Sequence, residues 1–261
     1  MKKLPQALFF DFDGTIVDPK SHEVPQSALD ALKQLHEKGY HICIASGRGY
    51  PLLKMTGIME QFPWSGYVLN NGQLIKDENE ETLIHHFIDH EAILQIIEEA
   101  NKLDLNIQFG ADEGDFMNKE ANEYVRNSHE FFHEPIAPIG VYTNQKCDKI
   151  LVYNKFGYDY APFKAIKGLA VFPGRSDYAD IACEGVSKAS AIIEMCKHKG
   201  WDVHYAAFGD SHNDMEMLLG ASLKVAMGNG EEDLKAIADV VAPNVWDDGL
   251  AKVLKELGYI D

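Results

Sequence analysis

Short apolar runs alternate along this chain with stretches whose apolar residues recur at helical spacing, and this alternation constrains the fold most. Residues 7–10 form the first run, residues 25–38 follow with helical spacing, and residues 41–45 form the next run. Pro25 lies near the start of the helical stretch and Gly39 just beyond its end, where helices favour these residues. The alternation predicts buried parallel strands joined by helices, which is an α/β fold.

The same alternation returns in the last third of the chain, but the middle differs. Further strands are predicted at 67–69, 204–208, 223–227 and 240–242, and helices at 187–199, 214–219, 231–238 and 250–257. The middle has an amphipathic stretch at 91–103, extended pieces at 107–109 and 149–153, and several prolines. We therefore expect residues 1–80 and 184–261 to form a Rossmann-like doubly wound parallel sheet core. Residues 81–183 are expected to form an inserted α+β domain.

The charge balance restricts the partners of the chain. Its 261 residues include 24 Lys and Arg against 41 Asp and Glu, a formal net charge of −17. Nucleic acid and anionic lipid carry the same sign, so neither is expected as a partner. A small phosphorylated substrate is still compatible with this charge, because a metal ion can invert the field within one cleft.

The sequence predicts neither a membrane span nor a signal peptide, and together with the cysteine pattern this indicates a cytoplasmic protein. No apolar run approaches the roughly 20 residues that span a bilayer. Lys2 and Lys3 precede a short apolar run, but that run is too short for a signal peptide. The four cysteines form no CxxC pair, so we expect reduced thiols and no zinc site.

Polar residues follow three of the predicted strands at the point where each strand ends. The strings are DFDGT at 11–15, SGR at 46–48 and GDSHND at 209–214. The carboxyl ends of strands in an open parallel sheet line the ligand crevice. These three segments, remote in sequence, are therefore predicted to form one site.

Three aspartates in these segments suggest a metal site. Asp11 and Asp13 are two residues apart and point to the same side while the strand continues. Two carboxylates this close repel one another unless a cation lies between them. With Asp210 they form an all-oxygen acidic cluster, which suits Mg²⁺. The alternative interpretation of the first pair is a solvated turn at a strand end.

Asp214 and Lys188 each have a structural and a functional interpretation. Asp214 could cap a helix, or it could join the acidic cluster, because Asp210, Asn213 and Asp214 fall on one face of a helix that begins near Asn213. Lys188 follows the predicted N-cap Ser187, where a cation opposes the helix dipole. An anion bound at that helix start would offset the cost, whereas the alternative is a solvated lysine.

The SGR segment is a weaker signal for phosphate binding. Ser46 and the backbone N–H groups of Gly47 and Arg48 are able to hold a phosphate oxygen, although a plain turn is the alternative. Arg48 either steers anions or pairs with a surface acid. No P-loop string is present, and no GxGxxG follows the first strand. Histidines 85, 86 and 90 are interpreted as exposed residues rather than metal ligands.

Taken together and in order, these segments resemble the four motifs of the haloacid dehalogenase-like phosphohydrolases, with Lys188 in GVSKAS as the third motif. The insertion between the second and third motifs is similar to the C2-type cap of the Cof-type branch, and residues 244–254 are similar to its C-terminus. The chain departs from the family at Ala189, where glycine is usual, and at Asp180, where glutamate is usual.

The resemblance implies phosphoryl transfer in two steps through an aspartyl-phosphate. Asp11 would be the nucleophile, and Asp13 would protonate the leaving oxygen and then activate water. Asp11, the backbone carbonyl of Asp13, and Asp210 would hold Mg²⁺, with Asp214 and Arg48 in support. The phosphate-binding residues would be Ser46, Gly47, Lys188 and Asn213.

The expected function is a Mg²⁺-dependent phosphatase acting on small phosphorylated metabolites, with sugar phosphates favoured. A phosphomutase of the same fold and a catalytically silent phosphometabolite-binding protein are the alternatives. The inserted domain would select the substrate, with Arg175 and Asp177 as candidate specificity residues. We expect a monomer or a weak homodimer.

Overall fold

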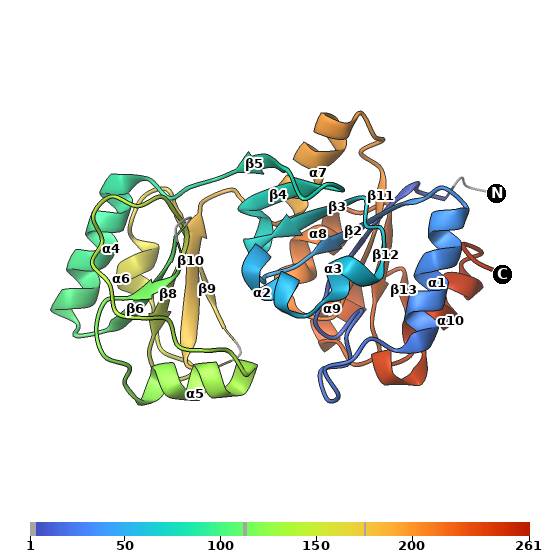
Figure 1. The fold of residues 1–261 in the computed structure, drawn as a ribbon. Helices are drawn as coiled ribbons and strands as arrows, with labels where there is room; N and C mark the ends of the chain where they lie inside the picture. The colour runs from blue at the N-terminus through green and yellow to red at the C-terminus, as the bar shows by residue number, and fades with distance from the viewer. Residues whose placement is uncertain (1–3, 112–113, 175) are drawn as a thin grey trace. The chain divides into compact units, whose positions relative to one another are not determined.

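The computed structural model describes residues 4–111, 114–174 and 176–261, and it divides the chain into two compact units. We call Met1–Ile84 together with Val186–Asp261 the core unit, and His85–Gly185 the inserted unit. Figure 1 shows the fold of both units. Each has its own apolar clusters, and each is described separately.

The core unit is built on one sheet. Among the described residues this sheet has eight strands, in the order β13-β12-β11-β1-β2-β3-β4-β5. In chain order the strands are β1 (Ala7–Phe10), β2 (His41–Ala45), β3 (Gly66–Leu69), β4 (Leu74–Asp77), β5 (Thr82–His85), β11 (Tyr205–Gly209), β12 (Leu223–Ala226) and β13 (Val240–Val241). Pairing is parallel from β13 through β1 to β3, which confirms the predicted α/β class. Strand β4 is antiparallel to β3, which the sequence did not predict.

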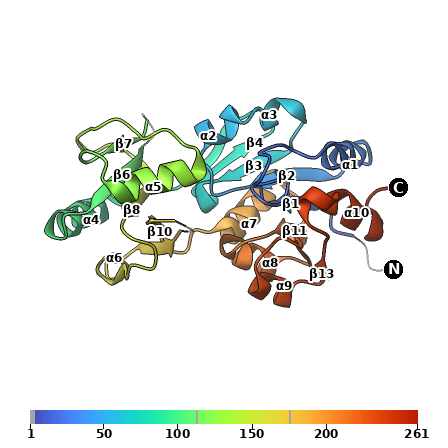
Figure 2. The same cartoon turned by 90° about the horizontal axis from the view of Figure 1, so that it is seen from below.

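Helices cover both faces of this sheet, as Figure 2 shows for α1 and α3 on one side and α8 and α9 on the other. Successive residues of a strand point to opposite faces. Leu8 and Phe10 accordingly join one apolar cluster, while Ala7 and Phe9 join another. The first cluster includes residues of α1 (Gln26–Glu37), α2 (Tyr50–Met55), α3 (Ile58–Gln61) and α10 (Gly249–Glu256), and the second includes residues of α7 (Lys188–Lys199), α8 (Met215–Gly220) and α9 (Glu232–Ile237).

Two helix starts near the predicted site are fixed by side chains. Ser187 is the N-cap of α7, where it forms a capping box with Ser190. Before α8, Ser211 forms a second capping box with Asp214 across the 3₁₀ helix η2 (His212–Asp214). The helix predicted to start near Asn213 is therefore a 3₁₀ turn followed by α8. The other 3₁₀ helices described are η1 (Asn70–Gly72) and η3 (Val245–Asp247).

The inserted unit consists of a sheet with helices. Its described strands lie in the order β7-β6-β8-β10-β9, and their pairings are antiparallel. The elements are α4 (His90–Lys102), β6 (Asn106–Ala111), β7 (Phe116–Met117), α5 (Glu123–Phe132), β8 (Cys147–Tyr153), α6 (Ala161–Lys164), β9 (Leu169–Pro173) and β10 (Tyr178–Cys183). Residues of α4 and α6 share an apolar cluster with the sheet. This mixture of helices and antiparallel strands agrees with the α+β class predicted for the insertion.

Two other features bear on the sequence predictions. Within the described ranges, no helix is long and apolar enough to cross a membrane. Cys43, Cys147, Cys183 and Cys196 are free thiols.

Candidate active site

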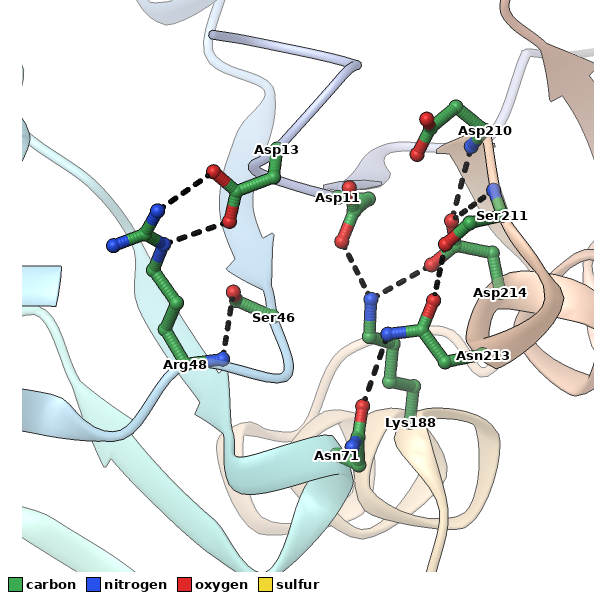
Figure 3. Close-up of polar contacts among 10 residues, drawn as sticks. All are labelled: Asp11, Asp13, Ser46, Arg48, Asn71, Lys188, Asp210, Ser211, Asn213 and Asp214. Atoms are coloured by element: carbon green, nitrogen blue, oxygen red, sulfur yellow. Dashed lines mark hydrogen bonds and ion pairs between the residues drawn. The ribbon is translucent and has the colours of Figure 1, made fainter. Parts of the chain in front are cut away.

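Three neighbouring strands of the core sheet end at the same edge. Strand β1 lies between β2 and β11 and is parallel to both, so their carboxyl ends are adjacent. Asp11 follows β1, Ser46 follows β2 and Asp210 follows β11. The structure thus brings together the segments that the sequence predicted to form one site (Figure 3).

A buried lysine joins two aspartates at the centre of this edge. Lys188 Nζ donates to Asp11 Oδ1 at 2.6 Å and to Asp214 Oδ1 at 2.7 Å, and the lysine side chain is fully buried. Burial lowers the pKa of Lys188, but the two carboxylates outweigh burial and raise it. The lysine is therefore a fixed positive charge, and the interpretation as a solvated residue is wrong.

The carboxylates outnumber the lysine. Single oxygens of Asp11, Asp210 and Asp214 all lie within 4.8 Å of one another, and all three residues are buried. Burial is the largest cause that raises the pKa of Asp11 well above its ordinary value, Asp214 raises it further, and Lys188 opposes the shift. A cluster of buried oxygen donors with excess negative charge has the chemistry that Mg²⁺ requires. The residues present therefore fit a divalent cation.

Glycine at position 14 lets the β1 loop approach Asp210. Gly14 has a φ of +87°, which L side chains rarely adopt. A Cβ built on it would lie 2.3 Å from Asp210 Oδ2. Any larger residue would displace this carboxylate, so Gly14 helps to place Asp210 beside the loop that follows β1.

Both oxygens of Asp214 have partners in the protein. Oδ1 contacts Lys188, while Oδ2 accepts hydrogen bonds from the backbone N–H groups of Asp210 at 3.0 Å and Ser211 at 3.1 Å. Asp214 thus fixes the loop after β11 and also positions the lysine. Asp214 therefore caps the start of the helical segment, and it also lies in the acidic cluster with Asp11 and Asp210.

Asp13 is paired with Arg48. Arg48 donates to both carboxylate oxygens, from Nε to Oδ2 at 2.7 Å and from Nη2 to Oδ1 at 2.9 Å (Figure 3). This bidentate geometry is the strong form of an Arg–carboxylate contact. The pair is partly exposed, with 45% of the Asp13 side chain accessible to solvent. Arg48 therefore holds Asp13 in one orientation at the edge of the site.

The candidate phosphate-binding residues lie beside an asparagine that sequence reasoning missed. Asn213 Nδ2 donates to Asn71 Oδ1 at 3.1 Å, and a Cβ at Gly47 would lie 3.1 Å from that same oxygen. Ser46 Oγ accepts from the backbone N–H of Arg48 at 3.0 Å. Asn71 has a φ of 53°, in the left-handed region that asparagine tolerates. The Asn-Asn-Gly string is therefore the sequence signal that could have indicated a turn at this position.

The inserted-unit candidates have different outcomes. Arg175 lies outside the described residues. Asp177 accepts hydrogen bonds from Asn127 Nδ2 at 2.9 Å and from the backbone N–H of Phe156 at 2.8 Å, so both oxygens of its carboxylate are engaged within the unit. His85 contacts Asp148, and His90 contacts Tyr142.

An α/β fold with an acidic site at the carboxyl ends of its strands is the arrangement that the resemblance to the haloacid dehalogenase-like phosphohydrolases implied. The profile of the haloacid dehalogenase-like hydrolases matches residues 8–254. The chain belongs to this family, and it is a phosphatase.

Known proteins resemble the chain over nearly its full length. YkrA of Bacillus subtilis (strain 168) is 29% identical over 97% of this chain and 98% of its own. Two solved structures share 28% of residues with it. BT1666 from Bacteroides thetaiotaomicron has a TM-score of 0.89 and covers 98% of this chain and 96% of its own. BT4131, a subclass IIB sugar phosphatase, has a TM-score of 0.86 and covers 98% and 100%.

Proposed function

We propose that the chain is a Mg²⁺-dependent phosphatase that hydrolyses small phosphorylated metabolites, sugar phosphates in particular, through an aspartyl-phosphate. The observation that carries the proposal is the fully buried lysine between Asp11 and Asp214, beside Asp210. The similarity to BT4131, a sugar phosphatase, supports the choice of substrate class.

In the first step Asp11 attacks the substrate phosphorus. A bond forms between its carboxylate oxygen and phosphorus, and the bond from phosphorus to the leaving oxygen breaks. The leaving oxygen takes a proton from Asp13. Asp13 accepts one hydrogen bond from Arg48 on each oxygen, which leaves a lone pair on each oxygen for that proton.

In the second step water hydrolyses the aspartyl-phosphate. Asp13 takes a proton from the water, whose oxygen bonds to phosphorus as the bond to Asp11 breaks. Lys188 stabilises the negative charge of the transferring group throughout, because its charge is fixed by two carboxylates. Ser46, Gly47 and Asn213, with Asn71 added, hold the phosphate oxygens.

Asp11, the backbone carbonyl of Asp13, and Asp210 would hold Mg²⁺. The bound ion would neutralise negative charge on Asp11 and on the substrate phosphate, which otherwise repel one another. Asp214 belongs to the same acidic cluster, but its oxygens are used by Lys188 and two backbone N–H groups. We therefore assign Asp214 to positioning the lysine and the loop rather than to the metal.

The inserted unit is proposed to act as the cap that selects the substrate. The residues assigned to phosphoryl transfer all belong to the core unit. Closure of a cap excludes water and aligns the leaving group. The partner is a small phosphorylated metabolite, and the protein is proposed to work in the cytoplasm as a monomer or a weak homodimer.

Release of inorganic phosphate from p-nitrophenyl phosphate, with Mg²⁺ and with excess EDTA, tests the proposal. We expect release with Mg²⁺ only. A phosphomutase must suppress hydrolysis, and a silent binding protein would release nothing. Folded protein that releases no phosphate with Mg²⁺ would contradict the phosphatase assignment.

A further inference from the structure

The segment that follows β12 packs closely against two other segments of the core unit. It consists of residues 227–231, contains the sequence Gly-Asn-Gly, and is here called the GNG loop. A Cβ built on Gly228 would lie 2.8 Å from the backbone oxygen of Ala242, and one built on Gly230 would lie 2.8 Å from the backbone oxygen of Asp210. A side chain at either position would push the loop away, so both glycines allow this close approach.

Backbone hydrogen bonds join the GNG loop to the end of β11 and the loop after it. The backbone N–H of Glu231 donates to the backbone oxygen of Asp210 at 2.8 Å. At the other end of the GNG loop, the backbone N–H of Met227 donates to the backbone oxygen of Gly209 at 2.9 Å. The GNG loop is therefore fixed directly against a residue assigned to the metal.

The side chain of Asn229 joins the same loop to the loop after β1. Its Nδ2 donates to the backbone oxygen of Gly14 at 2.8 Å, and its Oδ1 accepts from the backbone N–H of Val245 at 2.8 Å. A carbonyl only accepts and an N–H only donates, so these two contacts determine which end of the amide is which. Asn229 thus connects three segments that are remote in sequence.

The hydrogen bond to Gly14 is important because glycine does not restrict its own backbone. Gly14 has a positive φ and no Cβ, so contacts with its neighbours decide its conformation. Its N–H donates to the backbone oxygen of Val17 at 2.9 Å, and its own oxygen accepts from Asn229. The peptide between Asp13 and Gly14 is trans and planar, so a fixed Gly14 N–H also fixes the direction of the Asp13 carbonyl.

Gly14 also lies against the carboxylate of Asp210, since a Cβ on this glycine would meet Oδ2 at 2.3 Å. Movement of Gly14 would therefore change the surroundings of two oxygens at once, the Asp13 carbonyl and the Asp210 carboxylate. Both are oxygens that the proposed function assigns to Mg²⁺.

We propose that Asn229 is a positioning residue for the metal site, and that it orients the Asp13 carbonyl and the Asp210 carboxylate by holding Gly14. This inference rests on the proposed function, which assigns these two oxygens to Mg²⁺. Both ends of the Asn229 amide are bonded to backbone groups, so the residue acts through Gly14 and not on the ion. Replacing a residue that orients metal ligands typically weakens metal binding by about 10–100-fold.

The test is a calorimetric titration of the full-length, metal-free protein with Mg²⁺ alone, so the readout does not depend on turnover. Asn229→Ala should raise the Kd for Mg²⁺ by about tenfold or more, because Gly14 loses its partner. Asn244→Ala is the matched control, because Asn244 Nδ2 donates to Asp247 Oδ2 at 2.8 Å, next to Val245. This control loosens the same neighbourhood but keeps the contact with Gly14, so its Kd should stay within about twofold of wild type.

Asn229→Asp separates the two hydrogen bonds of this side chain. A carboxylate still accepts from the Val245 N–H but has no proton to donate to Gly14, so the Kd for Mg²⁺ should rise in this variant too. The added negative charge by itself would tighten the binding of a cation, so weaker binding reports the lost donor. If Asn229→Ala does not fold, Asn229→Asp decides the inference alone.

Four results would overturn the inference. The first two are a wild-type Kd in folded Asn229→Ala and tighter Mg²⁺ binding in Asn229→Asp. The third is an equal rise in Kd for Asn229→Ala and Asn244→Ala, because both would then act by loosening the core unit in general. In these three cases, phosphate release by the wild-type protein would still support the proposed function. The fourth is a wild-type protein that neither binds Mg²⁺ nor releases phosphate in its presence, which would refute the proposed function and this inference together.

Discussion

Replacing Asp214 with asparagine should destabilise the protein more than it weakens metal binding. One oxygen of Asp214 accepts from Lys188, and the other accepts from the backbone N–H groups of Asp210 and Ser211. An asparagine has one acceptor oxygen and one NH₂ group. Whichever way the amide turns, its NH₂ group meets either the ammonium or the two backbone donors.

The size of the effect follows from burial. The side chains of Asp214 and Lys188 are fully buried, so solvent does not screen the pair. Asp11 remains beside Lys188, so the lysine keeps one carboxylate partner, and the cost comes from lost hydrogen bonds to a charged group, about 1.5–3 kcal/mol. Relief of repulsion with Asp11 offsets part of this, which leaves about 2 kcal/mol. At about 2–4 °C per kcal/mol for a chain of this size, Tm should fall by about 4–8 °C.

Calorimetry in saturating Mg²⁺, followed by a Mg²⁺ titration of phosphatase activity, checks this. Asp30→Asn is the control, because that side chain is 57% exposed and should change stability by less than about 0.5 kcal/mol. The reasoning is refuted if Asp214→Asn leaves Tm unchanged and shifts the Mg²⁺ midpoint as far as Asp210→Asn does. Asp214 would then be a metal ligand and not a positioning residue.

Three further outcomes are expected. Asp11→Asn should lower kcat by about three orders of magnitude or more with the fold retained, since the amide lacks the anionic nucleophile, and a folded variant with a tenth of wild-type turnover would contradict the covalent mechanism. Asp210→Asn should raise the Mg²⁺ midpoint by about tenfold or more, because a charged ligand becomes neutral, and an unchanged titration would place the metal elsewhere. Asn71→Asp should raise KM for p-nitrophenyl phosphate by about tenfold, because a carboxylate beside Asn213 repels the phosphate, and an unaltered KM would remove Asn71 from the site.

The parallel core and the grouping of its motifs could be predicted because they depend on local pattern. Strand β1 is buried on both faces, so it is a continuous apolar run that ends at Asp11. Adjacent parallel strands then carry their C-terminal residues to one edge. No contact outside each segment was needed for these predictions.

The remaining features depend on tertiary contacts that no local pattern encodes. The turn at η1 reverses the chain so that β4 runs antiparallel to β3, and it places Asn71 beside Asn213. Arg48 pairs with Asp13 across 35 positions, and the sequence allowed any surface acid as its partner.

The capping box at the start of α7 has a mechanical consequence. The inserted unit ends at Gly185, so the peptide that rejoins the core unit reaches Lys188 within three residues. Between them, Ser187 is bound to Ser190 through both backbone and side chain. A change in backbone direction in the linker should therefore stop at Ser187. The position of Lys188 between two aspartates is therefore set within the core unit and does not depend on the backbone conformation of residues 185 and 186.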